Sequence, residues 1–241
     1  MNLDFLRVAA DDAVAHSPIE PVLRAAGARF EVRDGWNVAV AFGAGGSGGA
    51  AGVGVGGSTE GGGPAGWADT SHLAKLELQG STEAIDAVAG TELTFGTAVS
   101  RHDAWWCRLT GTRALIVGAS PAARERVNGA DGVNVLDVTS NFAAITIVGP
   151  LAREVFARFC ALDLRPAVTP VHALRPGSIG RQPGILIREA EDRYLSLFGW
   201  ATGEYMWSIV ADAGEHLGGR PIGAGTLAAL PAHGGEVGVS A

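Results

Sequence analysis

The chain has 241 residues, 47% of them hydrophobic, so it can bury a core without disulfides or metal ions. Its 25 acidic and 18 basic residues give a formal net charge of -7, which excludes an electrostatic attraction to nucleic acid or to an anionic membrane surface. The two cysteines, Cys107 and Cys160, form no CxxC motif and lie in no His/Cys cluster. The sequence therefore predicts neither a disulfide framework nor a zinc site.

The N-terminal segment and the glycine-rich stretch that follows it carry no targeting or phosphate-binding signature. MNLDFLRVAADDAVAHSP has acidic residues where a secretory signal has basic ones, and no segment reaches the length of a membrane span, so we expect a cytoplasmic protein. Residues 43–66 are about half glycine, contain no lysine or arginine and lead into no GK[ST] motif. This composition predicts a flexible linker or surface loop.

From residue 70 onward the chain contains the same unit twice. TSHLAKLELQGSTEAIDAVAGTEL at residues 70–93 and TSNFAAITIVGPLAREVFARFCAL at residues 139–162 align without a gap, 69 residues apart. Each copy has a polar approach, an apolar strand, a glycine and a helix, which indicates duplication of a supersecondary unit. The alternation over residues 74–78 predicts a strand with one face in water, whereas the apolar residues 143–148 predict a more deeply buried strand.

Capping residues mark the ends of the predicted helices. Ser81 is expected to cap the first helix and Gly90 to end it, and Pro150 suits the first position of the second. Thr202 and Gly214 are expected to begin and end the last helix. The other predicted elements are strands over residues 105–110, 113–117, 184–188 and 194–198, and a helix over residues 122–127.

The order strand, helix, strand, strand, helix is most of a split β-α-β, or ferredoxin-like, unit. Two such units predict an α+β protein with two pseudo-repeated ferredoxin-like halves and antiparallel sheets. We place the first half at residues 1–136, including the glycine-rich stretch, the second at residues 137–232 and a tail at residues 233–241.

The polar residues that attract notice form no complete catalytic motif. Ser71 and His72 are neighbours on the approach to a strand, so we interpret both as structural. Cys107 stands beside Arg108 in a predicted strand, shortly after Asp103. A basic neighbour lowers the pKa of a thiol, whereas a small buried thiol on an alternating strand is inert, and both interpretations stay open.

Several segments resemble one family in the right order. WADTSHLAKLELQG at residues 67–80 resembles the DxSHxGKxxxxG signature of the glycine cleavage T-protein, a folate-dependent aminomethyltransferase, and GWNVAVAF at residues 35–42 is similar to that family's GWxxPVxY. The second half is similar to the gamma subunit of heterotetrameric sarcosine oxidase, through SNFAAITIVGPLAREVFARFCALDLRPAV, GILIR, DRYLSLF and EYMWSIVADAG. The resemblance covers roughly residues 35–231, apart from the glycine-rich stretch.

The resemblance implies a tetrahydrofolate pocket between the two halves, in a family that transfers one-carbon units released from amines. Glu191 aligns with the family glutamate that binds the pterin. The candidate site residues are Glu191, Tyr194, Trp106 and Arg108 for cofactor binding, and Asp103 and Cys107 for catalysis.

Three family features have no counterpart at the aligned positions. The family's acidic pair aligns with Cys107 and Arg108, and its RDxLRLE segment aligns with residues 222–230, which contain no basic residue. The T-protein's C-terminal barrel domain is expected to be missing. Charge-assisted hydrogen bonds contribute about 1.5–3 kcal/mol each, so the loss of two weakens folate binding by a factor of about a hundred or more.

Two functions follow as alternatives. The first is a folate-binding protein that acts in one-carbon transfer or amine demethylation and has diverged at the folate-contacting positions. As an enzyme it would be a tetrahydrofolate-dependent aminomethyl or one-carbon transferase. The second is a non-catalytic gamma-type partner subunit of a larger flavoprotein oxidase or demethylase, and a homo-oligomer is the other assembly considered. Folate binding that Glu191→Ala abolishes favours the first, and co-purification of a flavoprotein favours the second.

Overall fold

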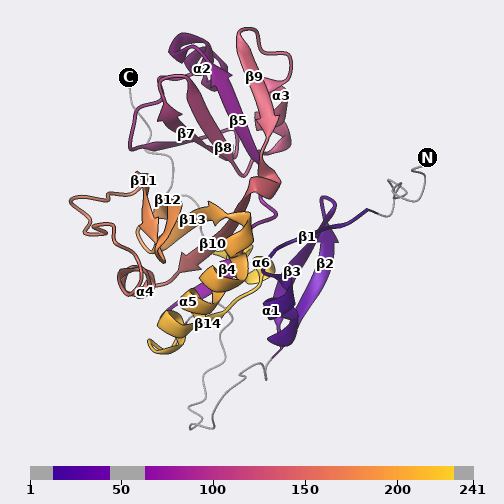
Figure 1. The fold of residues 1–241 in the computed structure, drawn as a ribbon, viewed down its shortest axis with the longest axis vertical. Coiled ribbons are helices and arrows are strands. Elements are labelled where there is room, and N and C mark those ends of the chain that lie inside the picture. The colour runs from indigo at the N-terminus through magenta and orange to yellow at the C-terminus, as the bar shows by residue number, and fades with distance from the viewer. Residues whose placement is uncertain (1–12, 44–62, 231–241) are drawn as a thin grey trace.

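The structure is a computed structural model that describes residues 13–43 and 63–230, which form three β-sheets with helices packed on them (Figure 1). The chain is an α+β protein with antiparallel pairing throughout most of its two larger sheets, which confirms the predicted fold class. Residues 44–62 of the glycine-rich stretch and the predicted tail lie outside the described residues. No helix in the described part of the chain is both long and apolar enough to span a membrane.

The five-stranded sheet, at the top of Figure 1, has the strand order β6-β7-β8-β5-β9, and all neighbours are antiparallel. Ser81 begins the first helix by accepting a hydrogen bond from Ala84 N at 3.2 Å, and Gly90 ends it with a φ of 69°. Apart from the edge strand β6, the order β5-α2-β7-β8-α3-β9 is a complete ferredoxin-like unit. Its elements are β5 (Lys75–Gly80), α2 (Thr82–Ala89), β6 (Ala98–Arg101), β7 (Ala104–Thr110), β8 (Arg113–Val117), α3 (Pro121–Val127) and β9 (Val133–Asp137).

The six-stranded sheet has the order β11-β12-β13-β10-β4-β14. Helices α4 and α5 cover one face through residues such as Phe156 and Val210, and α6 lies against Ala68 and Val148 on the other face. The elements are β4 (Gly66–Asp69), β10 (Phe142–Val148), α4 (Ala152–Ala157), β11 (Leu174–Ile179), β12 (Gln182–Ala190), β13 (Arg193–Gly199), α5 (Gly203–Glu215), β14 (Arg220–Pro221) and α6 (Ala224–Ala229), with short 3-10 turns at Thr139–Asn141 and Trp200–Thr202.

A small N-terminal sheet, β1-β3-β2, was not predicted from the sequence and lies beside the six-stranded sheet (Figure 1). Ile19, which precedes α1, and Leu23 within that helix enter the core beneath α5, and Val38 and Val40 contact Ala224 of α6. The elements are β1 (Ala15–His16), α1 (Glu20–Ala25), β2 (Ala28–Arg33) and β3 (Trp36–Phe42). The division of the chain at residues 136 and 137 stays a prediction.

Leu76 and Ile145, the centres of the two sequence copies, occupy equivalent strands. Leu76 lies opposite Asp137 of β9, and Ile145 lies opposite Asp69 of β4. β5, the first strand of one copy, therefore pairs with β9, which precedes the second copy in the chain. β10, the first strand of the second copy, pairs with β4, which precedes the first copy. Because β4 and β9 are exchanged in this way, the two ferredoxin-like units share backbone hydrogen bonds: Thr70 N donates to Ala144 O and Val138 N to Lys75 O, both at 2.9 Å.

The two larger sheets pack face to face through a core of apolar side chains. These side chains come from both sheets: Ala98, Trp105, Cys107, Leu115, Val117, Ala144, Leu174, Ile187, Leu195 and Leu197. Trp105 also donates a hydrogen bond through Nε1 to Glu189 Oε1 of the other sheet, at 2.8 Å. The centre of the interface between the halves is thus filled.

This packing corrects the prediction that β5 has one face in water. Lys75 and Glu77 are 0% and 7% exposed. They lie opposite Val117 and Leu115, which belong to the core between the sheets. Alternation of the sequence identified the two faces of the strand, but a second sheet covers the polar one.

Two helix boundaries and one predicted capping hydrogen bond differ from the prediction. Pro150 lies before α4, which begins at Ala152. Thr202 precedes α5, but its hydroxyl donates to Gly199 O at 2.7 Å and caps no amide of α5. Gly214 lies inside α5, which ends at Glu215, and a Cβ there would stand 2.8 Å from Trp67 Cε3. This glycine is needed for close packing and does not end the helix.

Candidate functional site

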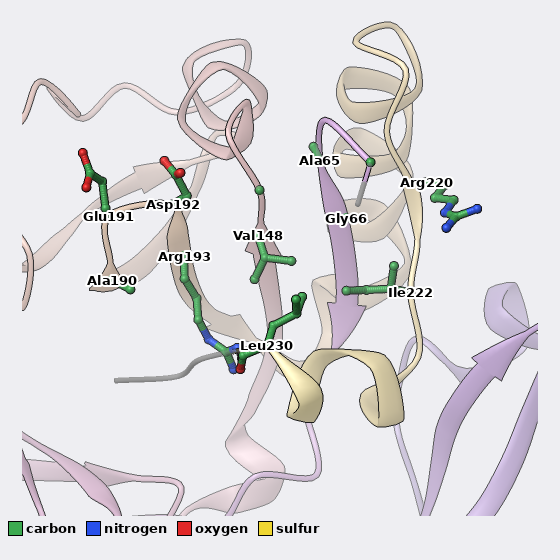
Figure 2. A pocket seen from close by; sticks show the side chains of 12 residues that line it. Ala65, Gly66, Val148, Ala190, Glu191, Asp192, Arg193, Arg220, Ile222 and Leu230 are labelled. Carbon is green, nitrogen blue, oxygen red and sulfur yellow. Dashed lines mark hydrogen bonds between the residues drawn. The ribbon is translucent and has the colours of Figure 1, made fainter. Parts of the chain in front are cut away.

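A cavity of about 250 Å³ opens at one end of the six-stranded sheet, on the face that carries α6 (Figure 2). Val148, Ile222 and Leu230 form an apolar floor. Glu191 and Asp192 stand at its rim, in the turn between β12 and β13. An apolar floor with a few polar groups at its edge is the usual composition of a small-molecule site.

Two glycines in the cavity lining, Gly66 of β4 and Gly149 directly after β10, allow close approaches between neighbouring segments. A Cβ on Gly66 of β4 would stand 3.1 Å from the side chain of Ile222, and a Cβ on Gly149 would stand 2.9 Å from Pro64 O. Gly149 also has a φ of 109°, which side-chain-bearing residues rarely adopt, and its N–H donates to Asp192 O at 2.9 Å. The end of β10 therefore holds the rim turn in place.

A buried ion pair supports the rim from below. Arg193 Nε donates to Glu189 Oε2 at 2.9 Å, and the two side chains are 12% and 7% exposed. The same guanidinium donates through Nη1 to Leu227 O at 3.2 Å and Leu230 O at 3.3 Å, at the end of α6. Since Glu189 Oε1 also accepts from Trp105, one carboxylate connects the cavity to both sheets.

The two rim carboxylates are free to meet a ligand. Glu191 and Asp192 are exposed, and within the described part of the chain neither forms an ion pair. Figure 2 shows both carboxylates above the turn, while Arg193 extends beneath them toward Leu230. The arrangement suits a flat apolar group whose edge carries N–H donors or a positive charge.

Of the six residues proposed from the sequence, Glu191 lines this cavity. Tyr194 follows the rim on β13 but packs on the opposite face of the sheet, its ring centroid 5.6 Å from that of Phe156. Burial raises the pKa of its phenol. Trp106 and Arg108 lie on the face of β7 that α2 covers, where Arg108 pairs with Asp86. The structure does not bring these three residues to the cavity.

The two candidates for catalysis lie elsewhere as well. Cys107 is fully buried in the core between the sheets, and burial raises the pKa of its thiol. Arg108, its neighbour, points to the other face of the strand, so the thiol lies away from the basic side chain that was expected to lower its pKa. Asp103 lies exposed in the turn between β6 and β7, with a φ of 52°, and does not line the cavity.

The motif that resembles DxSHxGK has a structural role where the chain crosses between the sheets. Asp69 Oδ1 accepts from Ser71 N at 2.9 Å, and Ser71 Oγ accepts from Ala144 N at 3.0 Å. Lys75 Nζ donates to the carbonyls of Ser71 and Leu73 at 2.8 and 2.7 Å. Burial lowers the pKa of Lys75 to about 8. His72 is mostly buried too, and this burial, with the charges of Lys75 and Arg33, lowers its pKa to about 4.

Sequence reasoning missed the residues that build the cavity, Glu189 and Arg193 above all. Their signal was a charged run, REAEDR, which joins two predicted strands and carries Glu189 just after the first and Arg193 just before the second. Two charged residues within buried strands are expected to pair with each other. The contact with Trp105, 84 residues away in the chain, carried no local signal.

Comparisons with known proteins agree with this architecture. No protein-family model and no curated protein matches the sequence. Among solved structures, a chain of the heterotetrameric sarcosine oxidase from Corynebacterium sp. U-96 has a TM-score of 0.57 and 21% identity, over 64% of this chain and 85% of that chain. The aminomethyltransferase T of the glycine cleavage system from Bartonella henselae has a TM-score of 0.62 and 15% identity, over 88% of this chain.

The present chain spans 60% of the length of that aminomethyltransferase. At these identities the likeness establishes the fold and not the activity. The resemblance found in the sequence is confirmed at that level. The chain has the duplicated α+β fold that the sarcosine oxidase chain and the glycine cleavage aminomethyltransferase share.

Proposed function

We propose that this protein binds a reduced folate at the cavity under the β12–β13 turn and acts in one-carbon transfer or amine demethylation. The observation that carries the proposal is the position of Glu191, a free carboxylate at the rim of an apolar cavity in a fold shared with an aminomethyltransferase. This is the residue that the sequence resemblance assigns to the pterin.

The residues present suit the ring system of such a ligand. A pterin is a flat heterocycle with N–H donors along one edge, which matches an apolar floor of Val148 and Ile222 beneath the carboxylate of Glu191. The volume of about 250 Å³ is close to the lower end of ligand sites, about 300 Å³. The cavity therefore accepts a ring-sized group and leaves the rest of a folate outside.

Each group of the site has a definite part in this proposal. Glu191 accepts hydrogen bonds from the ring, and the Glu189–Arg193 pair keeps the turn that carries it in place. The bound folate would supply a nitrogen that accepts the one-carbon unit. No carboxylate stands at the positions of Cys107 and Arg108, so the proposal concerns binding and assigns no catalytic residue.

Calorimetric titration with a reduced folate tests the proposal. Glu191→Gln should weaken binding about 10- to 100-fold, because a charge-assisted hydrogen bond contributes about 1.5–3 kcal/mol. Glu204→Gln is the matched control, since Glu204 is also an exposed glutamate but lies on α5, outside the cavity lining. Equal affinity of the Glu191 variant and the wild type, or no folate binding by the wild type, would contradict the proposal.

Assembly with a larger flavoprotein stays the alternative. Its support is the match over 85% of a chain from a heterotetrameric sarcosine oxidase. Co-expression with a candidate flavoprotein oxidase or demethylase, followed by size-exclusion chromatography, separates the two proposals. A stoichiometric complex without folate affinity favours the partner-subunit role.

A further inference from the structure

The duplication makes the β9 edge of the five-stranded sheet comparable with the β4 edge of the six-stranded sheet. Leu136 of β9 lies opposite Glu77, and Ala68 of β4 lies opposite Thr146. Glu77 and Thr146 are 69 residues apart, at the offset of the sequence repeat. Leu136 and Ala68 are therefore equivalent positions.

The two equivalent edges differ in what covers them. On β4, β14 adds a parallel strand, with Arg220 N donating to Ala65 O at 3.1 Å and Ile222 N to Trp67 O at 2.9 Å. Ile222 then packs on Ala68, which is 0% exposed. Within the described residues, β9 pairs with β5 alone, and Leu136 and Val135 are 43% and 39% exposed.

An uncovered apolar edge is a template for another strand. Natural edge strands are usually protected by lysine, proline or a bulge, and β9, with the sequence VNVLD, has none of these. The comparison with β4 indicates that this fold accommodates an additional strand at the same edge.

The free backbone groups of β9 determine which strand fits. Val138 N donates to Lys75 O across the β5–β9 pair. Backbone groups alternate along an antiparallel strand, so residues 134 and 136 also face β5, and Val133, Val135 and Asp137 direct their N–H and C=O groups outward. These three residues are symmetric about Val135.

We propose that β9 pairs antiparallel with β9 of a second copy of this chain, about a two-fold axis at Val135. Val135 then lies opposite Val135 of the other copy, and Val133 opposite Asp137. Every outward backbone group of the strand finds a partner. Asp137, the one charged residue of β9, lies opposite Val133 of the second chain and not opposite a second Asp137. Two β-branched side chains meet at the centre, a favourable cross-strand pair.

The pairing joins two five-stranded sheets into one. It uses a single short strand from each copy, so we expect a weak dimer, with a dissociation constant in the micromolar range. The inference does not depend on the ligand of the cavity, which lies in the other sheet.

Sedimentation equilibrium over the micromolar range tests the two-fold axis directly. The wild type should approach twice the mass of one chain at high concentration. Val135→Lys and Val135→Glu should each be monomeric, because two like charges would face each other at the axis. An equimolar mixture of the two variants should dimerise again, because the charges then attract.

Val32→Lys is the matched control, since Val32 is a 61% exposed valine on β2. It should dimerise like the wild type. Circular dichroism checks that the position 135 variants are folded, and hydrogen exchange of the wild type should slow at residues 133, 135 and 137 as concentration rises. A monomeric wild type, a dimeric Val135→Lys, or a mixture that stays monomeric would overturn the proposal.

Discussion

Replacing Lys75 by methionine should remove a specific part of the pH dependence of stability. Lys75 is 0% exposed, and burial lowers the pKa of its ammonium from 10.5 to about 8. Asp69 and Asp137 oppose this shift through their negative charges, but burial is the larger effect. Methionine keeps the approximate length of the side chain and carries no proton.

The sign follows from proton binding in the two states. Between pH 8 and 10.5 the unfolded chain keeps the proton on Lys75 and the folded protein has lost it. The unfolded state thus binds more protons, and the free energy of unfolding rises with pH across this window. The contribution is fully present above pH 10.5 and is lost as the pH falls through 8.

The magnitude is about 3 kcal/mol, since each pKa unit corresponds to about 1.36 kcal/mol. Urea unfolding of the wild type and of Lys75→Met should be compared at several pH values within that window. The difference in unfolding free energy between the two proteins should change by this amount toward high pH. Other titrating groups cancel in the difference. A difference that stays constant with pH would refute the reasoning.

Two further predictions concern packing and the support of the cavity. Gly214→Ala should lower the free energy of unfolding by about 1–3 kcal/mol, because the new Cβ would stand 2.8 Å from Trp67 Cε3. Gly199→Ala is the control, because a Cβ there meets no atom within 4 Å, and it should change the free energy of unfolding by less than about 0.5 kcal/mol. Thermal unfolding measures both variants. A double-mutant cycle of Trp105→Phe and Glu189→Gln should give a coupling energy of about 1.5–3 kcal/mol, since their hydrogen bond ends on a buried carboxylate. Additive effects of the two substitutions would argue against that bond.

The repeated elements could be predicted because their signals are local. Alternation and caps identified β5, β10 and the helices between Ser81 and Gly90 and near the chain end. The short strands β4 and β9 escaped, because their sequences, GWAD and VNVLD, become strands only through pairing with the other copy. The burial of Lys75 escaped for the same reason, since a distant sheet covers it.

Of the residues that line the cavity, the sequence indicated only Glu191, in the turn of the β12–β13 hairpin. Glu191 was found through its alignment with a family motif. The floor of the cavity combines Val148 with Ile222 and Leu230, which a C-terminal strand and helix bring across the sheet. Such a contact depends on topology, and no pattern near Val148 in the sequence indicates it.

The duplication also explains why the cavity forms in one half and not in the same form in the other. Val148 lies opposite Arg193 at the end of β10, and Gln79 lies opposite Arg113 at the equivalent end of β5. In both halves the arginine pairs with a buried glutamate, Glu189 or Glu77.

The two ends differ in the strand on the other side of the first strand, which is β4 beside β10 and β9 beside β5. Gly66 of β4 stands next to Val148, and Asn134 of β9 stands next to Gln79. The glycine lets Ile222 approach and close an apolar cavity, whereas the two amides leave an open polar surface. The two copies therefore place an arginine at the same end of the first strand, and the exchanged strands decide which of them encloses an apolar cavity.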